Sequence, residues 1–159
     1  MFSQTAMYAL RAMVQLSQTA PAPSSTAAIA ESALVPRAYL SKVLQELRKA
    51  GLVRCRRGVG GGVSLAVPAD RITILQVVTA VEPIRRFQVS PFLEHQNACL
   101  MPLHQKLDDA FNMLEASLSD TTLAEVADAS ANEVDSRRET HAGDRALEPQ
   151  HASRALIAL

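Results

Sequence analysis

The chain has 159 residues, 48% of them hydrophobic, so it can form one domain, or one domain with an appendage, around a largely aliphatic core. Aromatic residues make up only 4% and Trp is absent, which argues against a protein that stacks the bases of single-stranded nucleic acid. The net charge is zero, no apolar run is long enough to span a membrane, and two cysteines cannot form a disulfide framework, so a cytoplasmic protein is expected.

The amino-terminal part of the chain is predicted to form three helices. The first is expected over residues 3–18 with Ser3 as its cap, and the second runs from a serine cap to about Glu31. In the third helix, apolar residues recur at the helical spacing i, i+3, i+4 and i+7; they are Leu40, Val43, Leu44 and Leu47. Two helices joined by a short turn and followed by a hairpin predict a winged helix-turn-helix.

The hairpin is expected directly after the third helix. Residues 52–56 alternate as a strand does, a glycine-rich turn follows, and residues 63–66 return. The expected fold class is therefore mainly α with a small β-hairpin. Between Arg37 and Arg57 there are seven basic residues and one acid, a charge of +6, which leaves −6 for the rest of a chain with 16 residues of each sign. A basic helix beside a basic hairpin is typical of a protein that binds the backbone of double-stranded DNA.

The second half of the chain is predicted to be helical in parts. A short fourth helix, with apolar residues from Ile72 to Val81, is expected to pack against the hairpin and the first helix. After a loop, a long helix should run from about Pro102 to Leu118 with an apolar seam formed by Leu103, Leu107, Ala110, Phe111, Leu114 and Leu118. The small domain leaves little core to cover this seam, so a homodimer is expected.

Three segments are expected in all. Residues 1–82 should form the winged helix-turn-helix, residues 83–130 a sensor-type loop followed by the dimerisation helix, and residues 131–159 a flexible tail, because this last stretch is polar and poorly periodic.

Several short motifs resemble the IscR/NsrR (Rrf-two) family of bacterial winged helix-turn-helix transcription regulators. The motifs are Tyr8–Arg11, Tyr39–Lys42, Leu47–Val53, Arg57–Gly62, Ile72–Val78, Val81–Pro83 and Thr122–Val126. The resemblance thus covers about residues 1–130, and the Arg-Gly-Val-Gly-Gly-Gly stretch is its most specific part. It implies a DNA-binding regulator.

The expected DNA contacts are Arg37, Tyr39, Ser41, Lys42, Gln45, Arg56, Arg57 and Gly58. Ser41 and Gln45 point outward from the third helix, where base edges would lie. Three cations, Arg37, Lys42 and Arg56, should bind phosphates, which position a protein without reading sequence. The resemblance implies that Arg57 and Gly58 contact the minor groove.

Members of the family often hold an iron–sulfur cluster through three cysteines in the loop before the dimerisation helix. The corresponding positions here are Met101, His95 and either Val89 or Ser90, none of which is a cysteine. Cys99 lies two residues away, and His104 matches a histidine that serves as fourth ligand in part of the family. The candidate metal ligands are therefore Cys99 and His104. Alternatively, Cys99 is a small buried filler and His104 a polar residue at a helix start.

Cys55 is the other cysteine, and it is a candidate redox residue. It lies between Arg54 and Arg56, where positive neighbours favour the reactive thiolate, and its oxidation would disturb a nearby phosphate contact. Alternatively, strand alternation places Cys55 on the same side as Val53, as a buried filler of the hairpin.

The sequence favours a homodimeric, sequence-specific transcription regulator, a repressor, that binds a palindromic operator. It contains no catalytic constellation, so no enzymatic activity is expected. Two alternatives remain open: a winged-helix protein-interaction module without DNA binding, and a cluster- or metal-dependent redox sensor that uses Cys99 and His104.

Overall fold

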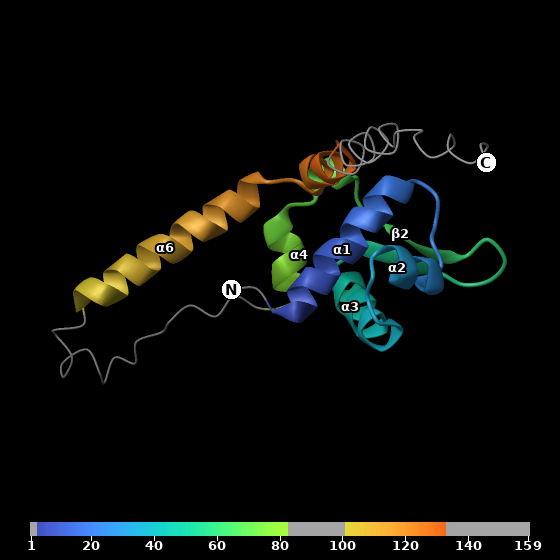
Figure 1. Ribbon diagram of the computed structural model, residues 1–159, viewed down its shortest axis with the longest axis horizontal. Helices are drawn as coiled ribbons and strands as arrows, with labels where there is room; N and C mark the ends of the chain where they lie inside the picture. Colours follow the sequence, from blue (N-terminus) through green and yellow to red (C-terminus); the bar gives the residue numbers. More distant parts are fainter. Residues whose placement is uncertain (1–2, 83–100, 133–159) are drawn as a thin grey trace, which may run out of the picture. The chain divides into compact units, whose positions relative to one another are not determined.

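The protein was analysed as a computed structural model, which describes residues 3–82 and 101–132 (Figure 1). Its elements are the helices α1 (Gln4–Thr19), α2 (Thr26–Ser32) and α3 (Arg37–Lys49), the strands β1 (Val53–Arg56) and β2 (Gly62–Leu65), a 3₁₀ turn (Ala69–Arg71), and the helices α4 (Ile74–Val81) and α6 (Met101–Asp120). Residues 123–132 are helical as well. The chain divides into two compact units, residues 1–127 and 128–159, and the first unit contains all the elements from α1 to α6.

Side-chain caps define where the helices begin. The hydroxyl of Ser3 accepts a hydrogen bond from the amide of Ala6, and Ser25 caps α2 through the amide of Ala28. These caps confirm the predicted starts of the first two helices. The fourth helix begins at Ile74, later than the apolar pattern suggested, because a 3₁₀ turn comes first and Thr73 then forms a capping box.

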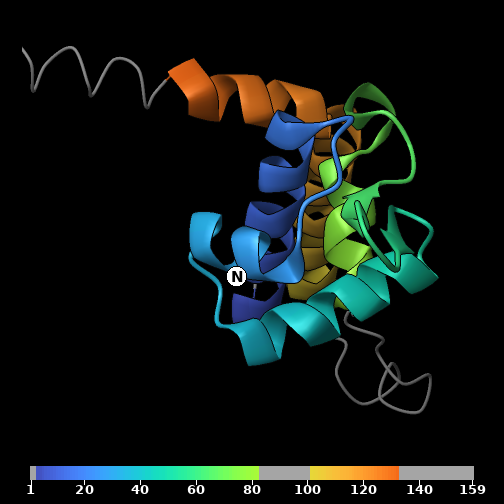
Figure 2. The same cartoon turned by 90° about the vertical axis from the view of Figure 1, so that its right-hand side faces the viewer.

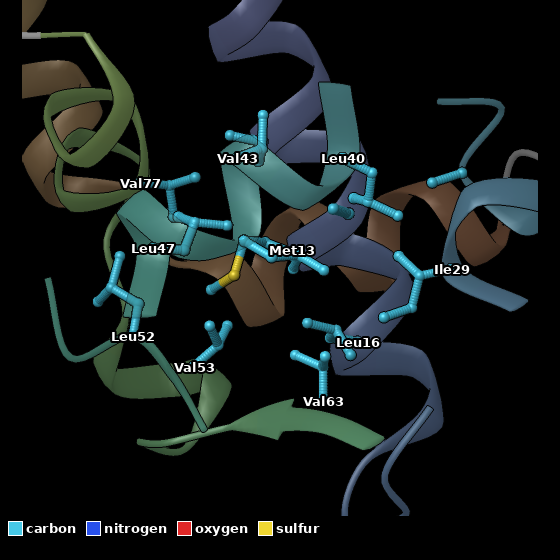
Figure 3. Packing of buried hydrophobic residues seen from close by; sticks show 14 of the residues in the cluster. Met13, Leu16, Ile29, Leu40, Val43, Leu47, Leu52, Val53, Val63 and Val77 are labelled. Atoms are coloured by element: carbon cyan, nitrogen blue, oxygen red, sulfur yellow. The ribbon is translucent and has the colours of Figure 1, made fainter. Parts of the chain in front are cut away.

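The core lies between α1, α2, α3 and the hairpin (Figure 3). Its largest fully buried side chains are Met13, Leu16, Ile29, Leu40, Leu47, Ile72, Leu123, Val43, Val53, Val77 and Val78. The core is therefore aliphatic, as the composition predicted. Helix α3 runs across α1 (Figure 2), so that one face of α3 is sealed by the core and the other is left free.

Helix α4 packs against α1, α3 and α6. The hairpin is not among its main partners, although Val77 of α4 belongs to the same core cluster as Val53 and Val63 of the hairpin. The inner face of the hairpin is already covered, because β1 packs against α3 and β2 against α1. The first helix is the partner that was predicted correctly.

The two strands pair antiparallel, with Val53 opposite Leu65 and Arg56 opposite Gly62. The hairpin gains a third partner from the connection between α1 and α2. The amide of Ser24 donates to the carbonyl of Val63 at 2.9 Å, and the amide of Val63 donates back to Ser24 at 2.8 Å. The wing is thereby attached to the helix-turn-helix on two sides.

Helix α6 begins at Met101 and has no buried residue. Near its end, Leu118 packs against a small cluster formed by Ala6, Ile74 and Val78. Beyond α6, the amide of Leu123 donates to the carbonyl of Ile72 at 2.8 Å. These contacts join the carboxyl end of α6 to α1 and α4.

The predicted loop and tail fall largely on residues 83–100 and 133–159, which are outside the described part of the chain, so the division at residues 82 and 130 stays a prediction. Within residues 3–82 and 101–132, none of the helices combines the length and hydropathy that a membrane crossing requires.

Candidate nucleic-acid interface

Helix α3 has two chemically distinct faces. Its buried face consists of Leu40, Val43, Leu44 and Leu47, as predicted. The residues expected to contact DNA from this helix are all exposed; they are Arg37, Tyr39, Ser41, Lys42 and Gln45. At 100° per residue, Gln45 points directly away from the buried stripe, while Tyr39 lies on one flank and Arg37 on the other. The apolar stripe thus fixes the helix to the core and presents the polar face outward.

The turn before α3 sets the angle at which that face is presented. The amide of Val35 donates to the carbonyl of Ala30 at 3.0 Å, and the buried side chain of Val35 anchors the turn. Leu34 has a φ of +53°, which is unusual for a residue with a side chain, and its own side chain is 77% exposed. Pro36 then precedes the first turn of the helix, where its missing N–H costs no hydrogen bond.

Tyr39 is held on the flank of α3 that faces α1. Its ring centroid lies 5.9 Å from that of Tyr8 with an interplanar angle of 52°, a tilted aromatic pair. The hydroxyl of Tyr8 in turn accepts a hydrogen bond from the amide group of Gln4 at 3.1 Å. Tyr39 nevertheless stays 59% exposed, so its ring edge and hydroxyl are available to a ligand of the α3 face.

Three side chains on α3 already have hydrogen-bond or ion-pair partners within the protein. The hydroxyl of Ser41 donates to the carbonyl of Arg37 at 3.2 Å, which leaves its oxygen lone pairs as acceptors. Glu46, the acid of the basic segment, pairs with Lys49 at 2.9 Å. This ion pair offsets the charge of Lys49, so the positive potential over α3 comes mainly from Arg37, Lys42, Arg48 and the hairpin.

The hairpin presents exposed arginines on the strand that follows α3. Arg54 donates through Nη2 to the carbonyl of Ala66 at 2.8 Å and so braces the base of the hairpin. Arg56 and Arg57 are exposed, and so is Gly58 at the tip. All eight predicted DNA contacts are therefore accessible, five on α3 and three on the hairpin.

Glycine is required by the geometry of the wing tip. A Cβ on Gly61 would lie 2.4 Å from the carbonyl oxygen of Arg56, closer than any real contact. The amide of Gly61 donates to the carbonyl of Gly58 at 2.9 Å, which closes the tip. Sequence reasoning missed Val59, whose side chain stands fully in solvent between two glycines with positive φ. The position of Val59 inside the glycine-rich motif was the feature of the sequence that could have indicated its exposure.

Cys55 is exposed, so the interpretation of this residue as a buried filler of the hairpin is wrong. Alternation did place Cys55 on the same side of β1 as Val53, which is buried. Cys55, however, lies two pairs nearer to the tip than Val53. Its partner Val63 on β2 is buried, so the core covers β2 farther toward the tip than it covers β1. The thiol of Cys55 is accessible on the face of β1 opposite to Arg56.

The fold and this surface define a class of protein: a winged helix-turn-helix with an exposed, basic third helix and a basic wing is a DNA-binding module. The model of the Rrf2 family, described as an iron-dependent transcriptional regulator, matches residues 2–129. The chain belongs to this family of DNA-binding transcription regulators, whose members are not enzymes.

Individual relatives agree with this assignment. A protein of Haemophilus influenzae, named as an HTH-type transcriptional regulator, is 31% identical over 140 residues, which cover 84% of this chain and 88% of the relative. Among solved structures, IscR of T. potens has a TM-score of 0.67 with 27% identity and covers 82% of this chain and 88% of its own. CymR, the global cysteine regulator of B. subtilis, has a TM-score of 0.66 with 26% identity, covering 81% and 97%.

The donor set of this chain does not fit the iron–sulfur cluster that the family implies. Such clusters are usually held by four thiolates, with histidine as an occasional substitute. The chain has two cysteines, and Cys55 belongs to the hairpin, so only Cys99 is available near the predicted loop. Cys99 lies outside the described residues, and His104 is in the first turn of α6. Within the described part of the chain, no three His, Cys, Asp or Glu side chains are grouped to hold a metal ion.

Proposed function

We propose that this chain is a homodimeric, sequence-specific DNA-binding regulator that represses transcription from a palindromic operator. The observation that supports the proposal best is the division of α3. Its apolar side chains are buried, whereas the five residues of α3 that are expected to touch DNA are all exposed on its remaining surface. A helix with this division can enter a major groove while its other side stays fixed to the core.

The contacts divide into two kinds. Ser41 and Gln45 read base edges, Gln45 being suited to adenine and Ser41 acting mainly as an acceptor because its hydrogen is used by Arg37. Arg37, Lys42 and Arg56 bind phosphates and set the register, and Tyr39 contacts the backbone from the flank of α3. At the wing tip, which is the turn of the hairpin, Arg57 and Gly58 contact the minor groove.

A second copy of the chain pairs with the first through α6. The seam predicted for this helix remains uncovered by the described residues over most of its length: Leu103 is 52% exposed and Leu114 is 40% exposed. An apolar seam of this length is stabilised when it packs against its own copy. Two-fold symmetry then places two α3 helices about one turn of DNA apart, or a simple multiple of it, which predicts a palindromic operator.

The difference between sequence-dependent contacts and phosphate contacts can be tested by comparing Arg57→Ala with Lys42→Ala. A duplex selected from a random library serves as the specific target, and a scrambled duplex of the same composition serves as the control. In fluorescence anisotropy, Arg57→Ala should weaken binding to the selected duplex more than to the scrambled one, by about 1–3 kcal/mol. Lys42→Ala should weaken both alike. Equal losses for both variants would refute the assignment, and a library that yields no enriched duplex would favour a protein-interaction module.

A further inference from the structure

The outer side of the hairpin carries a cleft of about 490 Å³. It lies where the two strands meet the connection between α1 and α2 and the segment after β2. The residues that matter for its chemistry are Pro21, Arg54, Arg56, Ser64, Leu65 and Pro68. The volume is within the range of about 300–1,000 Å³ that is usual for small-molecule sites.

Cationic groups converge on one part of this cleft. Arg54 and Arg56 are two residues apart on one strand and therefore project from the same side of the hairpin. Ser64 is the cross-strand partner of Arg54, which adds a hydroxyl beside the guanidinium. Arg54 donates one N–H to Ala66, but a guanidinium carries five N–H donors, so most of them are free.

No acid of the described residues neutralises either arginine. The acid of the basic segment, Glu46, pairs with Lys49, and the side-chain hydrogen bond of Arg54 ends on the carbonyl of Ala66. Two neighbouring guanidinium groups without a counter-charge favour an oxyanion, because guanidinium matches the geometry of carboxylate and phosphate.

The other walls of the cleft are apolar. They are formed by Pro21, Leu65, Val67 and Pro68, together with two alanines. These walls would contact the hydrocarbon part of a small ligand, and burial of that part would add to the binding free energy. A phosphate group alone has no apolar surface to bury there. The combination indicates a ligand with an anionic head and a short apolar body, which the backbone of DNA does not provide.

We propose that this cleft binds a small organic anion, with a carboxylate or phosphate head and a short apolar body, and that its occupancy weakens DNA binding. The claim that occupancy weakens DNA binding rests on the function proposed above, in which Arg56 binds a DNA phosphate. An anion in the cleft engages the guanidinium of Arg56 and removes it from DNA, so ligand and DNA compete for one side chain.

Binding to the cleft is tested without DNA. The ¹⁵N-labelled full-length chain is titrated with n-butyl phosphate, and with inorganic phosphate in parallel, at constant ionic strength. Amide shifts should concentrate at Ala20 and from Ser64 to Val67, and butyl phosphate should bind roughly threefold tighter or more than phosphate because of the apolar walls. Shifts that spread over the exposed face of α3, or equal affinities for the two anions, would overturn the proposal.

Matched variants separate the site from general charge. Arg54→Gln should weaken butyl phosphate binding by roughly tenfold, since a charged hydrogen-bonding group is lost. Arg71→Gln removes the same charge from the exposed 3₁₀ turn outside the cleft and should leave the affinity unchanged. Because Arg54 also braces the hairpin, Arg54→Lys is measured as well, with an unchanged amide spectrum away from the cleft as evidence of folding. Equal losses in Arg54→Gln and Arg71→Gln would contradict a defined site.

The coupling is tested by anisotropy with a fluorescent duplex. Saturating butyl phosphate should lower DNA affinity in the wild type and in Arg71→Gln, and Arg54→Gln should abolish this effect. If butyl phosphate binds the cleft but leaves DNA affinity unchanged, the regulatory half is overturned. If the chain binds no duplex at all, the proposed function fails, while the titration without DNA still decides whether the cleft takes an anion. If DNA shifts the cleft amides and butyl phosphate does not, the cleft is a DNA phosphate site and the proposal is wrong.

Discussion

Gly62 in β2 lies directly against the backbone of Ser24, so that a Cβ on Gly62 would be 2.8 Å from the carbonyl oxygen of Ser24. The neighbouring residue, Val63, exchanges two backbone hydrogen bonds with Ser24. The wing is therefore positioned by the connection between α1 and α2 as well as by α3. Glycine at this position permits that close approach, which fixes the orientation of the wing relative to the third helix.

Gly62→Ala should consequently destabilise the protein. The added methyl group meets backbone that cannot move aside without breaking the hydrogen bonds of Val63, a cost of about 1–3 kcal/mol for overpacking. The free energy of unfolding from urea denaturation measures the effect. Gly58→Ala is the matched control, because a Cβ there has open space and only the positive φ of +95° is unfavourable. A Gly62→Ala variant as stable as the wild type would contradict the close contact.

Leu34→Asn should stabilise the protein. Leu34 holds a left-handed backbone conformation with a largely exposed side chain, so replacing it loses little packing. Asparagine tolerates this conformation better than leucine, and the relief should raise the free energy of unfolding by about 0.5–1 kcal/mol. Leu34→Ala keeps the strain and should show no gain. The same denaturation measurement decides, and equal values for Asn and Ala would argue against strain at this turn.

Alkylation of Cys55 should weaken DNA binding. Its thiol is exposed on the strand that carries Arg56, although on the other face of that strand, so a carbamidomethyl group would add bulk to the wing close to the proposed phosphate contact. Affinity should fall roughly tenfold, the value of about one charged hydrogen bond. The reaction is carried out on a Cys99→Ser background so that only Cys55 is modified. Cys55→Ser treated in the same way is the control and should be unaffected. Full retention of affinity after complete modification would show that the thiol lies away from the DNA.

Leu114→Asp should convert the proposed dimer into monomers. The substitution places a charge in the apolar seam of α6, where pairing with a second copy would bury it without a partner. Asn112→Asp adds the same charge about 150° away from the seam on the same helix and should leave the dimer intact. Sedimentation velocity distinguishes the two masses. A wild-type protein that sediments as a monomer, or two variants that behave alike, would refute pairing through this seam.

The sequence predicted the elements whose signals are local. The four leucine and valine positions of α3 have a clear helical period, and the arginine–glycine stretch after Arg56 specifies a turn, so the helix and the hairpin were placed correctly. Serine caps gave the starts of α1 and α2 for the same reason. All eight predicted DNA contacts proved to be exposed, which is as far as burial can test them.

Features that depend on distant residues were not predictable. Alternation gave the side of β1 on which Cys55 lies, but it could not tell how far the core extends along the hairpin. The pairing of Ser24 with Val63 joins residues 39 positions apart and has no local signal. The cleft likewise brings together Ala20 and Pro21 with the two strands of the hairpin, which are far away in the sequence. The unusual φ of Leu34 also escaped prediction, because no glycine or asparagine marks the position.

The central claim, that the exposed face of α3 and the wing bind double-stranded DNA, is tested most directly by the salt dependence of binding. Affinity for a selected duplex is measured by fluorescence anisotropy over a series of salt concentrations. With about six phosphate contacts per dimer, affinity should fall steeply, by roughly 10³-fold between about 50 and 200 mM salt, and Lys42→Ala should make the slope shallower. Weak binding that hardly changes with salt would contradict the account.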